Sequence, residues 1–288
     1  MRNAMQLKAI IRNIAKEKRI SAQLVLQNYM LERFLERVSL SSYRDNYIIK
    51  GGFLIASMVG LDTRATMDMD ATIKGMPVNP ETVREMIEAI LSVPVEDDVS
   101  FELKSIGSIR KDDIYGGFRA ALTANYGKMA IPLKLDITIG DSITPKEIEY
   151  EYKLMLEDRS IRVLAYNLTT VLAEKLEAVI SRSDQSTRLR DYYDIFILAK
   201  LEAQNINSDQ LGLALRKTSE RRGSFGTIMQ YRKIIETVRN SEVMKQRWLD
   251  YQKDFEYAKG ILFEDACDAV LAVMEKACGY KKPAEGSD

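Results

Sequence analysis

The spacing of hydrophobic residues divides the chain into two halves of different character. Up to about residue 155, some stretches have apolar residues at helical spacing and others have them at every second position, which is typical of half-buried strands. Beyond about residue 160 the spacing stays helical. We therefore predict an α+β domain over residues 1–155, an all-α domain over residues 156–280 and a polar tail at residues 281–288.

The alternating stretches predict the strands of the first half. They are residues 66–73, 99–106, 116–126 and 129–140, and residues 47–50 form a further short apolar run. Helices are expected within residues 4–40, where Ser21 can cap the second of them, and in a segment that ends near Gly60. The segment at residues 143–153 is interpreted as a loop or short linker.

Composition excludes several classes of chemistry. The chain has no histidine and only two cysteines, so a zinc site of His and Cys, or a catalytic triad that needs His, cannot form. Cys267 and Cys278 lie in an apolar helical pattern and are interpreted as buried free thiols. Basic and acidic residues number 42 each, so the net charge gives no argument for a nucleic-acid partner. No apolar run approaches the roughly 20 residues that span a bilayer. With no secretory leader recognisable at the start, we expect a cytoplasmic protein without a membrane partner.

The strongest chemical signal is a set of three carboxylates. Asp68 and Asp70 are two residues apart on a predicted strand and therefore project from the same face, and Asp136 lies on the polar face of another strand. Adjacent anions are costly unless a cation lies between them, and oxygen ligands of this kind suit Mg²⁺ or Mn²⁺. If the two strands are neighbours, the carboxylates could form a metal site. The alternative is the solvated face of an edge strand.

Two further signals are weaker by themselves. Gly51 and Gly52 stand between a short strand and a helix, where backbone N–H groups can approach phosphate, although an ordinary turn also explains them. Lys175 on one predicted helix could meet Asp191 and Asp194, which are three residues apart on the next. The alternatives there are a solvated face or a structural ion pair between helices.

Taken in order, these motifs resemble those of the AbiEii/AbiGii-type toxins, nucleotidyltransferase-like proteins of bacterial abortive-infection and toxin–antitoxin systems. The segments that carry the resemblance are Lys50-Gly51-Gly52-Phe53-Leu54, Arg64 to Asp70, Leu135-Asp136-Ile137, Glu174-Lys175 and Arg190 to Asp194. The resemblance implies a nucleotidyltransferase-like fold, in which a small mixed β-sheet with flanking helices precedes an all-α C-terminal domain. It also implies use of an NTP with Mg²⁺ or Mn²⁺, an RNA acceptor such as tRNA, and a cognate antitoxin.

Matched motif by motif, the resemblance also assigns roles to residues. Metal binding falls to Asp68, Asp70 and Asp136, and Asp136 could help to activate the attacking hydroxyl. NTP binding falls to Gly51, Gly52, Thr66, Lys175, Asp191 and Asp194, and Lys175 counts among the catalytic residues with the three aspartates. The sequence departs from the common pattern at Phe53, where many nucleotidyltransferases have a serine, and Arg64 and Thr66 are the nearest polar substitutes.

Other functions remain open at this stage. Asp70 with Glu102 and Lys104 resembles the acidic-plus-ExK pattern of restriction-like metal nucleases, and a kinase-like or non-catalytic protein could have the same fold. Basic residues that could contact RNA form two clusters, although solvated helix ends explain such clusters equally well. They are Arg182, Arg188 and Arg190, then Arg216, Lys217, Arg221 and Arg222.

Overall fold

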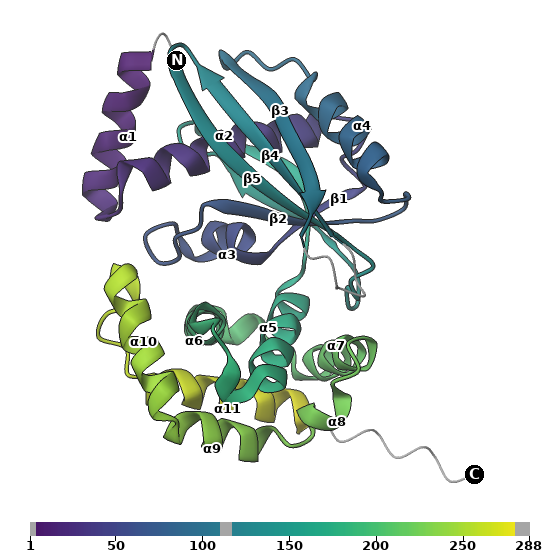
Figure 1. Ribbon diagram of the computed structural model, residues 1–288, viewed down its shortest axis with the longest axis vertical. Coiled ribbons are helices and arrows are strands. Elements are labelled where there is room, and N and C mark those ends of the chain that lie inside the picture. The colour runs from purple at the N-terminus through teal and green to yellow at the C-terminus, as the bar shows by residue number, and fades with distance from the viewer. Residues whose placement is uncertain (1–3, 110–116, 280–288) are drawn as a thin grey trace. The chain divides into compact units, whose positions relative to one another are not determined.

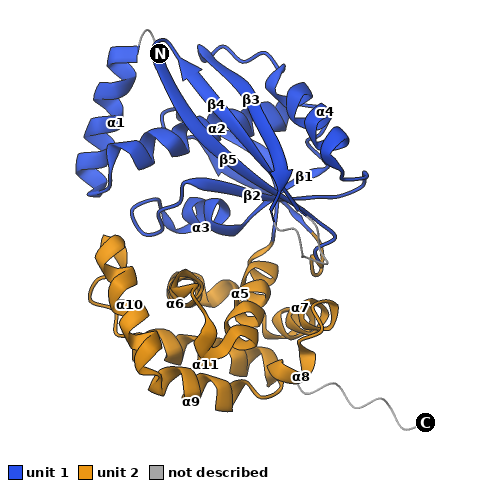
Figure 2. Ribbon diagram, in the orientation of Figure 1, with its two compact units in different colours: residues 1–141, 147–166 blue, residues 142–146, 167–288 orange. Residues whose placement is uncertain are grey.

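The computed structural model of the chain describes residues 4–109 and 117–279, so the predicted tail at 281–288 lies outside the described residues. The chain forms two compact units (Figure 2). The first consists of residues 1–141 and 147–166, and the second of residues 142–146 and 167–288. Residue 155, the predicted end of the first domain, lies between β6 and β7, which pair with each other within the first unit.

The first unit is built on one mixed sheet of seven described strands in the order β3-β4-β5-β2-β1-β7-β6 (Figure 1). The strands are β1 (Tyr47–Lys50), β2 (Asp68–Ile73), β3 (Val99–Ser108), β4 (Gly117–Tyr126), β5 (Met129–Ile139), β6 (Ile148–Lys153) and β7 (Ser160–Ala165). β2 runs parallel to β5, and β1 runs parallel to β7, while the other pairs are antiparallel. The predicted strands in the first half are therefore confirmed for the described residues.

The expectations for residues 143–165 were wrong, because this segment contributes two strands. Among the described strands, β6 pairs with β7 alone and lies at the edge of the sheet, where charged residues are tolerated, and Glu149 and Glu151 are exposed. In β7, Ile161 and Val163 are buried while Arg162 is exposed, which is the alternation of a half-buried strand. β7 has only six residues and precedes a long helical stretch, so its alternation was too short to be recognised in the sequence.

The described residues of the first unit include four helices: α1 (Ala4–Lys18), α2 (Ala22–Leu40), α3 (Gly51–Val59) and α4 (Pro80–Leu91). Ser21 caps α2 as expected, and its hydroxyl accepts a hydrogen bond from the amide of Leu24 at 3.1 Å. α3 ends at Gly60. Met69 on β2 and Leu135 on β5 are fully buried on the apolar side of the sheet, and α2 (Figure 1) packs against β5 and β7.

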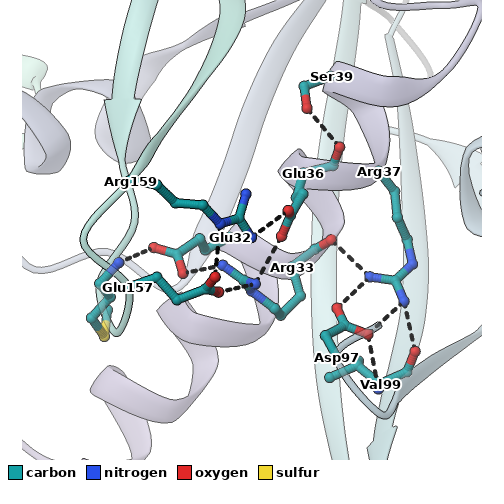
Figure 3. Close-up of polar contacts among 10 residues, drawn as sticks. Glu32, Arg33, Glu36, Arg37, Ser39, Asp97, Val99, Glu157 and Arg159 are labelled. Atoms are coloured by element: carbon teal, nitrogen blue, oxygen red, sulfur yellow. Dashed lines mark hydrogen bonds and ion pairs between the residues drawn. The ribbon is translucent and has the colours of Figure 1, made fainter. Parts of the chain in front are cut away.

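A stripe of buried charge along α2 was not foreseen. Its members, all less than a tenth exposed, are Glu32, Arg33, Glu36 and Arg37. Arg33 forms ion pairs with Glu32 at 2.6 Å and with Glu36 at 2.8 Å (Figure 3). Burial raises the pKa of Glu32 to about 7, although the positive charge of Arg33 acts in the opposite direction.

These α2 charges connect the helix to two loops. Arg37 forms a fork with both carboxylate oxygens of Asp97, at 2.7 and 2.9 Å, just before β3 (Figure 3). Glu157 and Arg159, in the turn between β6 and β7, pair with Arg33 and Glu36 respectively. These ion pairs attach both loops to α2. Moving either loop away would leave a buried charge on α2 without its partner, which is costly.

The second unit is helical, as predicted. Its helices are α5 (Leu168–Arg182), α6 (Leu189–Leu201), α7 (Ser208–Arg221), α8 (Phe225–Ile228), α9 (Tyr231–Asn240), α10 (Glu242–Asp254) and α11 (Phe263–Cys278). α11 packs against α6, α7 and α9. Trp248 is buried in an aromatic cluster, and Cys267 is buried while Cys278 is partly exposed, both as free thiols. Within residues 4–109 and 117–279, no helix is long and apolar enough to cross a membrane.

Candidate active site

The three candidate metal ligands lie on two neighbouring parallel strands. β2 and β5 are in a register that pairs Asp70 with Asp136 and Asp68 with Lys134. Asp68, Asp70 and Asp136 share the polar face of the sheet, because residues two apart on a strand point the same way and paired residues of adjacent strands do too. The sheet therefore places the carboxylates of Asp70 and Asp136 side by side on adjacent strands. The third, Asp68, lies two residues away from Asp70 on β2.

The glycine turn packs directly against one of these carboxylates. Gly51 has a φ of +63°, a backbone conformation that favours glycine, and a Cβ atom at this position would lie 2.2 Å from Oδ2 of Asp70. A Cβ at Gly52 would lie 2.9 Å from a guanidinium nitrogen of Arg64 and 3.0 Å from Oγ1 of Thr66. The two polar residues named above as substitutes for serine therefore stand beside the turn.

The turn is also the start of a helix. α3 begins at Gly51, and no side chain caps it. The first N–H groups of a helix have no partner within the helix, and its N-terminus favours negative charge. The backbone at Gly51 and Gly52 thus provides donors suited to an anion next to Asp70.

A buried polar cluster at the ends of β2 and β5 was missed by sequence reasoning. Asp141 accepts hydrogen bonds from Nζ of Lys50 at 2.5 Å and from the hydroxyls of Thr72 and Thr138 at 2.6 and 2.8 Å. Burial acts to raise the pKa of Asp141, but the charge of Lys50 and these hydrogen bonds outweigh it and hold the pKa well below its usual range. Asp141 therefore remains ionised and holds the ammonium group of Lys50, which is paired with Asp70 in the sheet. Thr72 and Thr138 continue the polar alternation of the two strands, and that was the available signal.

The carboxylate of Asp136 already has a partner. Arg119 on β4 is its direct neighbour across the β4–β5 ladder, and the guanidinium donates from Nε to Oδ1 and from Nη2 to Oδ2, each at 2.7 Å. Among the described residues, no three acidic or cysteine side chains are arranged as a ready group of metal ligands. Both oxygens of Asp136 accept from Arg119 in this conformation.

The helical motif lies in the second unit. Nζ of Lys175 on α5 lies 2.5 Å from Oδ1 of Asp191 and 2.8 Å from Oδ2 of Asp194, both on α6. The side chain of Asp194 is fully buried and that of Lys175 is 17% exposed. The structure thus brings these three residues together, as an ion pair between helices.

The residues of the nuclease alternative are separated by the sheet. Glu102 and Lys104 lie on β3, and β4 and β5 stand between that strand and β2, which carries Asp70. Their side chains are about half exposed and form a pair with each other at 2.5 Å. The acidic-plus-ExK arrangement therefore does not assemble around Asp70.

Several of the clustered basic residues have partners of their own. Arg222 forms ion pairs with Glu174 and Glu177 on α5, and Arg216 pairs with Glu220 one turn along α7. The guanidinium of Arg190 lies over the ring of Phe255. Part of the positive charge in these clusters is thus neutralised within the second unit.

The chain matches a known protein family over most of its length. A family model described as "Nucleotidyl transferase AbiEii toxin, Type IV TA system" matches residues 33–273. The chain belongs to this family. The match runs from α2 to α11 and includes every candidate site residue named above. The resemblance found in the sequence motifs is therefore confirmed, and the AbiEii family is that of toxins of type IV toxin–antitoxin systems.

A solved structure supports the same fold. A crystal structure of a Helicobacter pylori protein assigned as a nucleotidyltransferase is 15% identical, with a TM-score of 0.50, and the match covers 92% of this chain and all of that one. A second, JHP933 from Helicobacter pylori, is 17% identical, with a TM-score of 0.47 and coverage of 89% and 94%. No curated protein gives a significant match. The predicted nucleotidyltransferase-like α+β fold of this AbiEii-family chain is confirmed.

Proposed function

We propose that this AbiEii-family chain is a metal-dependent nucleotidyltransferase that transfers a nucleotide from an NTP to an RNA acceptor of the tRNA type, and that it acts as a toxin held in check by a cognate antitoxin. The observation that carries the proposal is the register that pairs Asp70 with Asp136 while the Gly51 turn packs on the Asp70 carboxylate. Carboxylates beside an uncapped helix N-terminus suit a substrate made of phosphates and a hard cation.

Asp68, Asp70 and Asp136 would hold Mg²⁺ or Mn²⁺. The donor set fits these ions, because all three ligands are oxygen anions on one face of the sheet, and such ions usually bind through a few carboxylates together with substrate phosphates. When bound, the metal neutralises phosphate charge and lowers the pKa of the attacking hydroxyl.

Residues of the chain would also hold the triphosphate and activate the acceptor hydroxyl. The amides at Gly51 and Gly52, with Thr66 beside them, would hold the triphosphate so that its α-phosphorus faces the acceptor. The acceptor oxygen forms a bond to this phosphorus as the bond to the bridging oxygen breaks, and pyrophosphate leaves. Asp136 would help to take the proton of the acceptor hydroxyl.

Lys175, Asp191 and Asp194 are proposed to bind the nucleotide, with Lys175 neutralising the leaving pyrophosphate. Lys175→Met is then expected to raise KM for the NTP by about tenfold, because a charge-assisted contact to phosphate is lost. The measurement is KM for a labelled NTP at a fixed acceptor concentration. Arg222→Gln is the control, because it also removes ion pairs from α5. An unchanged KM in Lys175→Met would leave Lys175 with a structural role only.

The experiment that tests the function is incubation of the full chain with total bacterial RNA, Mg²⁺ and each α-³²P-labelled NTP in turn. We expect label on an RNA band. EDTA should abolish this label and excess Mg²⁺ or Mn²⁺ should restore it, because the carboxylates and the triphosphate are all negatively charged and need a cation between them. Label that transfers from γ-³²P-NTP but not from α-³²P-NTP would identify a kinase instead, and shortened RNA without label would identify a nuclease. No label under any condition would favour a non-catalytic protein.

The dependence of KM on salt concentration tests whether the acceptor is RNA. Binding of RNA through phosphate contacts weakens steeply as salt is added, because counterions are released on binding. If RNA is the acceptor, its KM should rise with salt while KM for the NTP changes much less. A flat response would point to a small-molecule acceptor.

A further inference from the structure

Arg119 stands at the edge of the candidate metal site, and no role has been assigned to it. It is the direct cross-strand neighbour of Asp136, which in turn is the direct neighbour of Asp70, so the three side chains form one row across β4, β5 and β2. The guanidinium meets Asp136 with two parallel hydrogen bonds of 2.7 Å each. This fork is the strongest arrangement available to an arginine and a carboxylate.

The negative charges around Arg119 hold its guanidinium in this position. The hydrogen bonds and charge of Asp136, together with the charges of Asp68 and Asp70, raise the pKa of the Arg119 guanidinium, and burial opposes them only in part. Three carboxylates on one face need positive charge nearby, since adjacent anions are costly. Arg119 supplies it from the edge of the site.

The same contact conflicts with metal binding. A divalent cation held by Asp136 would lie within a few ångströms of a guanidinium fixed on the same carboxylate, and like charges at that separation repel strongly where water is partly excluded. The side chain of Asp136 is 16% exposed, so it has little freedom to turn elsewhere, whereas that of Arg119 is 47% exposed and can swing away. The arginine is therefore the partner that moves.

We propose that Arg119 is a positioning residue that competes with the metal for Asp136, and that the guanidinium, once displaced, binds a phosphate of the incoming NTP. This inference rests on the proposed metal-dependent transferase. Under it, metal and NTP bind cooperatively, because the NTP stabilises the arginine in the position to which the metal drives it. Without the nucleotide, the protein then binds the metal only weakly.

Lys134 provides a matched control. It carries the same charge, lies on the same face of β5 two residues from Asp136, and is paired in the sheet with Asp68. Its side chain is exposed, and it cannot form a planar fork with a carboxylate. A change seen in both Arg119→Gln and Lys134→Gln reports the electric field, and a change seen only in the former reports competition for Asp136.

The test is the affinity of the full chain for Mn²⁺, measured by electron paramagnetic resonance with and without a non-hydrolysable NTP analogue. Arg119→Gln should bind Mn²⁺ alone about tenfold more tightly than wild type, and Lys134→Gln less than threefold more tightly. The analogue should tighten Mn²⁺ binding strongly in wild type and much less in Arg119→Gln. Arg119→Lys should fall between the two, since it keeps the charge and loses the fork.

Two results would overturn the inference: equal effects of Arg119→Gln and Lys134→Gln, or an analogue effect that is the same in wild type and Arg119→Gln. Failure of the underlying function looks different. If Asp70→Asn binds Mn²⁺ as tightly as wild type, the metal is not held by these carboxylates at all. Arg119 is half exposed on a long ladder, so its variants should fold, and circular dichroism melting curves check this.

Discussion

Asp68→Asn should lower the rate of nucleotide transfer by about 10³-fold or more while the unfolding temperature stays close to that of the wild type. The substitution keeps the shape of the side chain and removes one anionic oxygen from the proposed metal site. Several kcal/mol of charge stabilisation at a phosphoryl centre depend on such ligands, and each 1.36 kcal/mol is a factor of ten in rate. The side chain is only partly buried, and its backbone contact to Thr66 does not involve the carboxylate.

The rate is measured in a single turnover with α-labelled NTP, so that product release does not mask the chemical step. Asp45→Asn serves as the control, because Asp45 is an exposed aspartate in the loop before β1, away from the β2 carboxylates. Excess Mn²⁺ should recover part of the activity of Asp68→Asn if the loss is one of metal affinity. A rate within tenfold of wild type would remove Asp68 from the set of ligands.

The chemistry of this site could be predicted from local pattern, but its assembly could not. The alternation around Asp68, Asp70 and Asp136 fixed which side chains share a face, since the period of a strand is two residues. Which strands are neighbours depends on contacts between segments far apart in the chain. The parallel register of β2 with β5 brings Asp70 beside Asp136, and nothing within either segment specifies that register.

The residues that the sequence did not reveal share one property, which is that their partners are distant in the chain. Arg33 and Glu36 lie on α2 with a spacing typical of a solvated helix face, yet both are buried because Glu157 and Arg159 reach them from the β6–β7 turn. Arg119 is similarly an ordinary polar position of an amphipathic strand until Asp136 faces it. Buried charge is permitted only by pairing, so the burial itself could not be inferred before the partners were known.

The edge strand β6 was missed for a different reason. Its sequence, IEYEYK, alternates apolar and charged residues as a strand with one solvated face does, so the pattern was present. The run is only six residues long, half of them are charged, and it follows Pro145 and Lys146, which together favoured a linker over a strand. The strands that carry the candidate site are central ones, and for these the pattern was sufficient.

Gly51→Ala should abolish most of the transfer activity, by about 10²-fold or more, at a modest cost in stability. The backbone at Gly51 is left-handed, which costs an alanine about 1–2 kcal/mol. The added Cβ would also lie 2.2 Å from Oδ2 of Asp70, so the carboxylate must move away. Moving a side chain end costs the fold little, but displacement of a reacting group by about 1 Å can cost 10²-fold in rate.

Gly127→Ala separates these two effects. Gly127, in the turn between β4 and β5, has a similar φ of +57°, and a Cβ there meets nothing closer than 3.4 Å. It therefore reports the cost of the backbone conformation without any clash in the site. Chemical denaturation should show comparable losses of unfolding free energy for the two variants, while the single-turnover rate falls only in Gly51→Ala. If both variants retained full activity, the turn would be structural, and the close packing of Gly51 on Asp70 would carry no argument for phosphate binding.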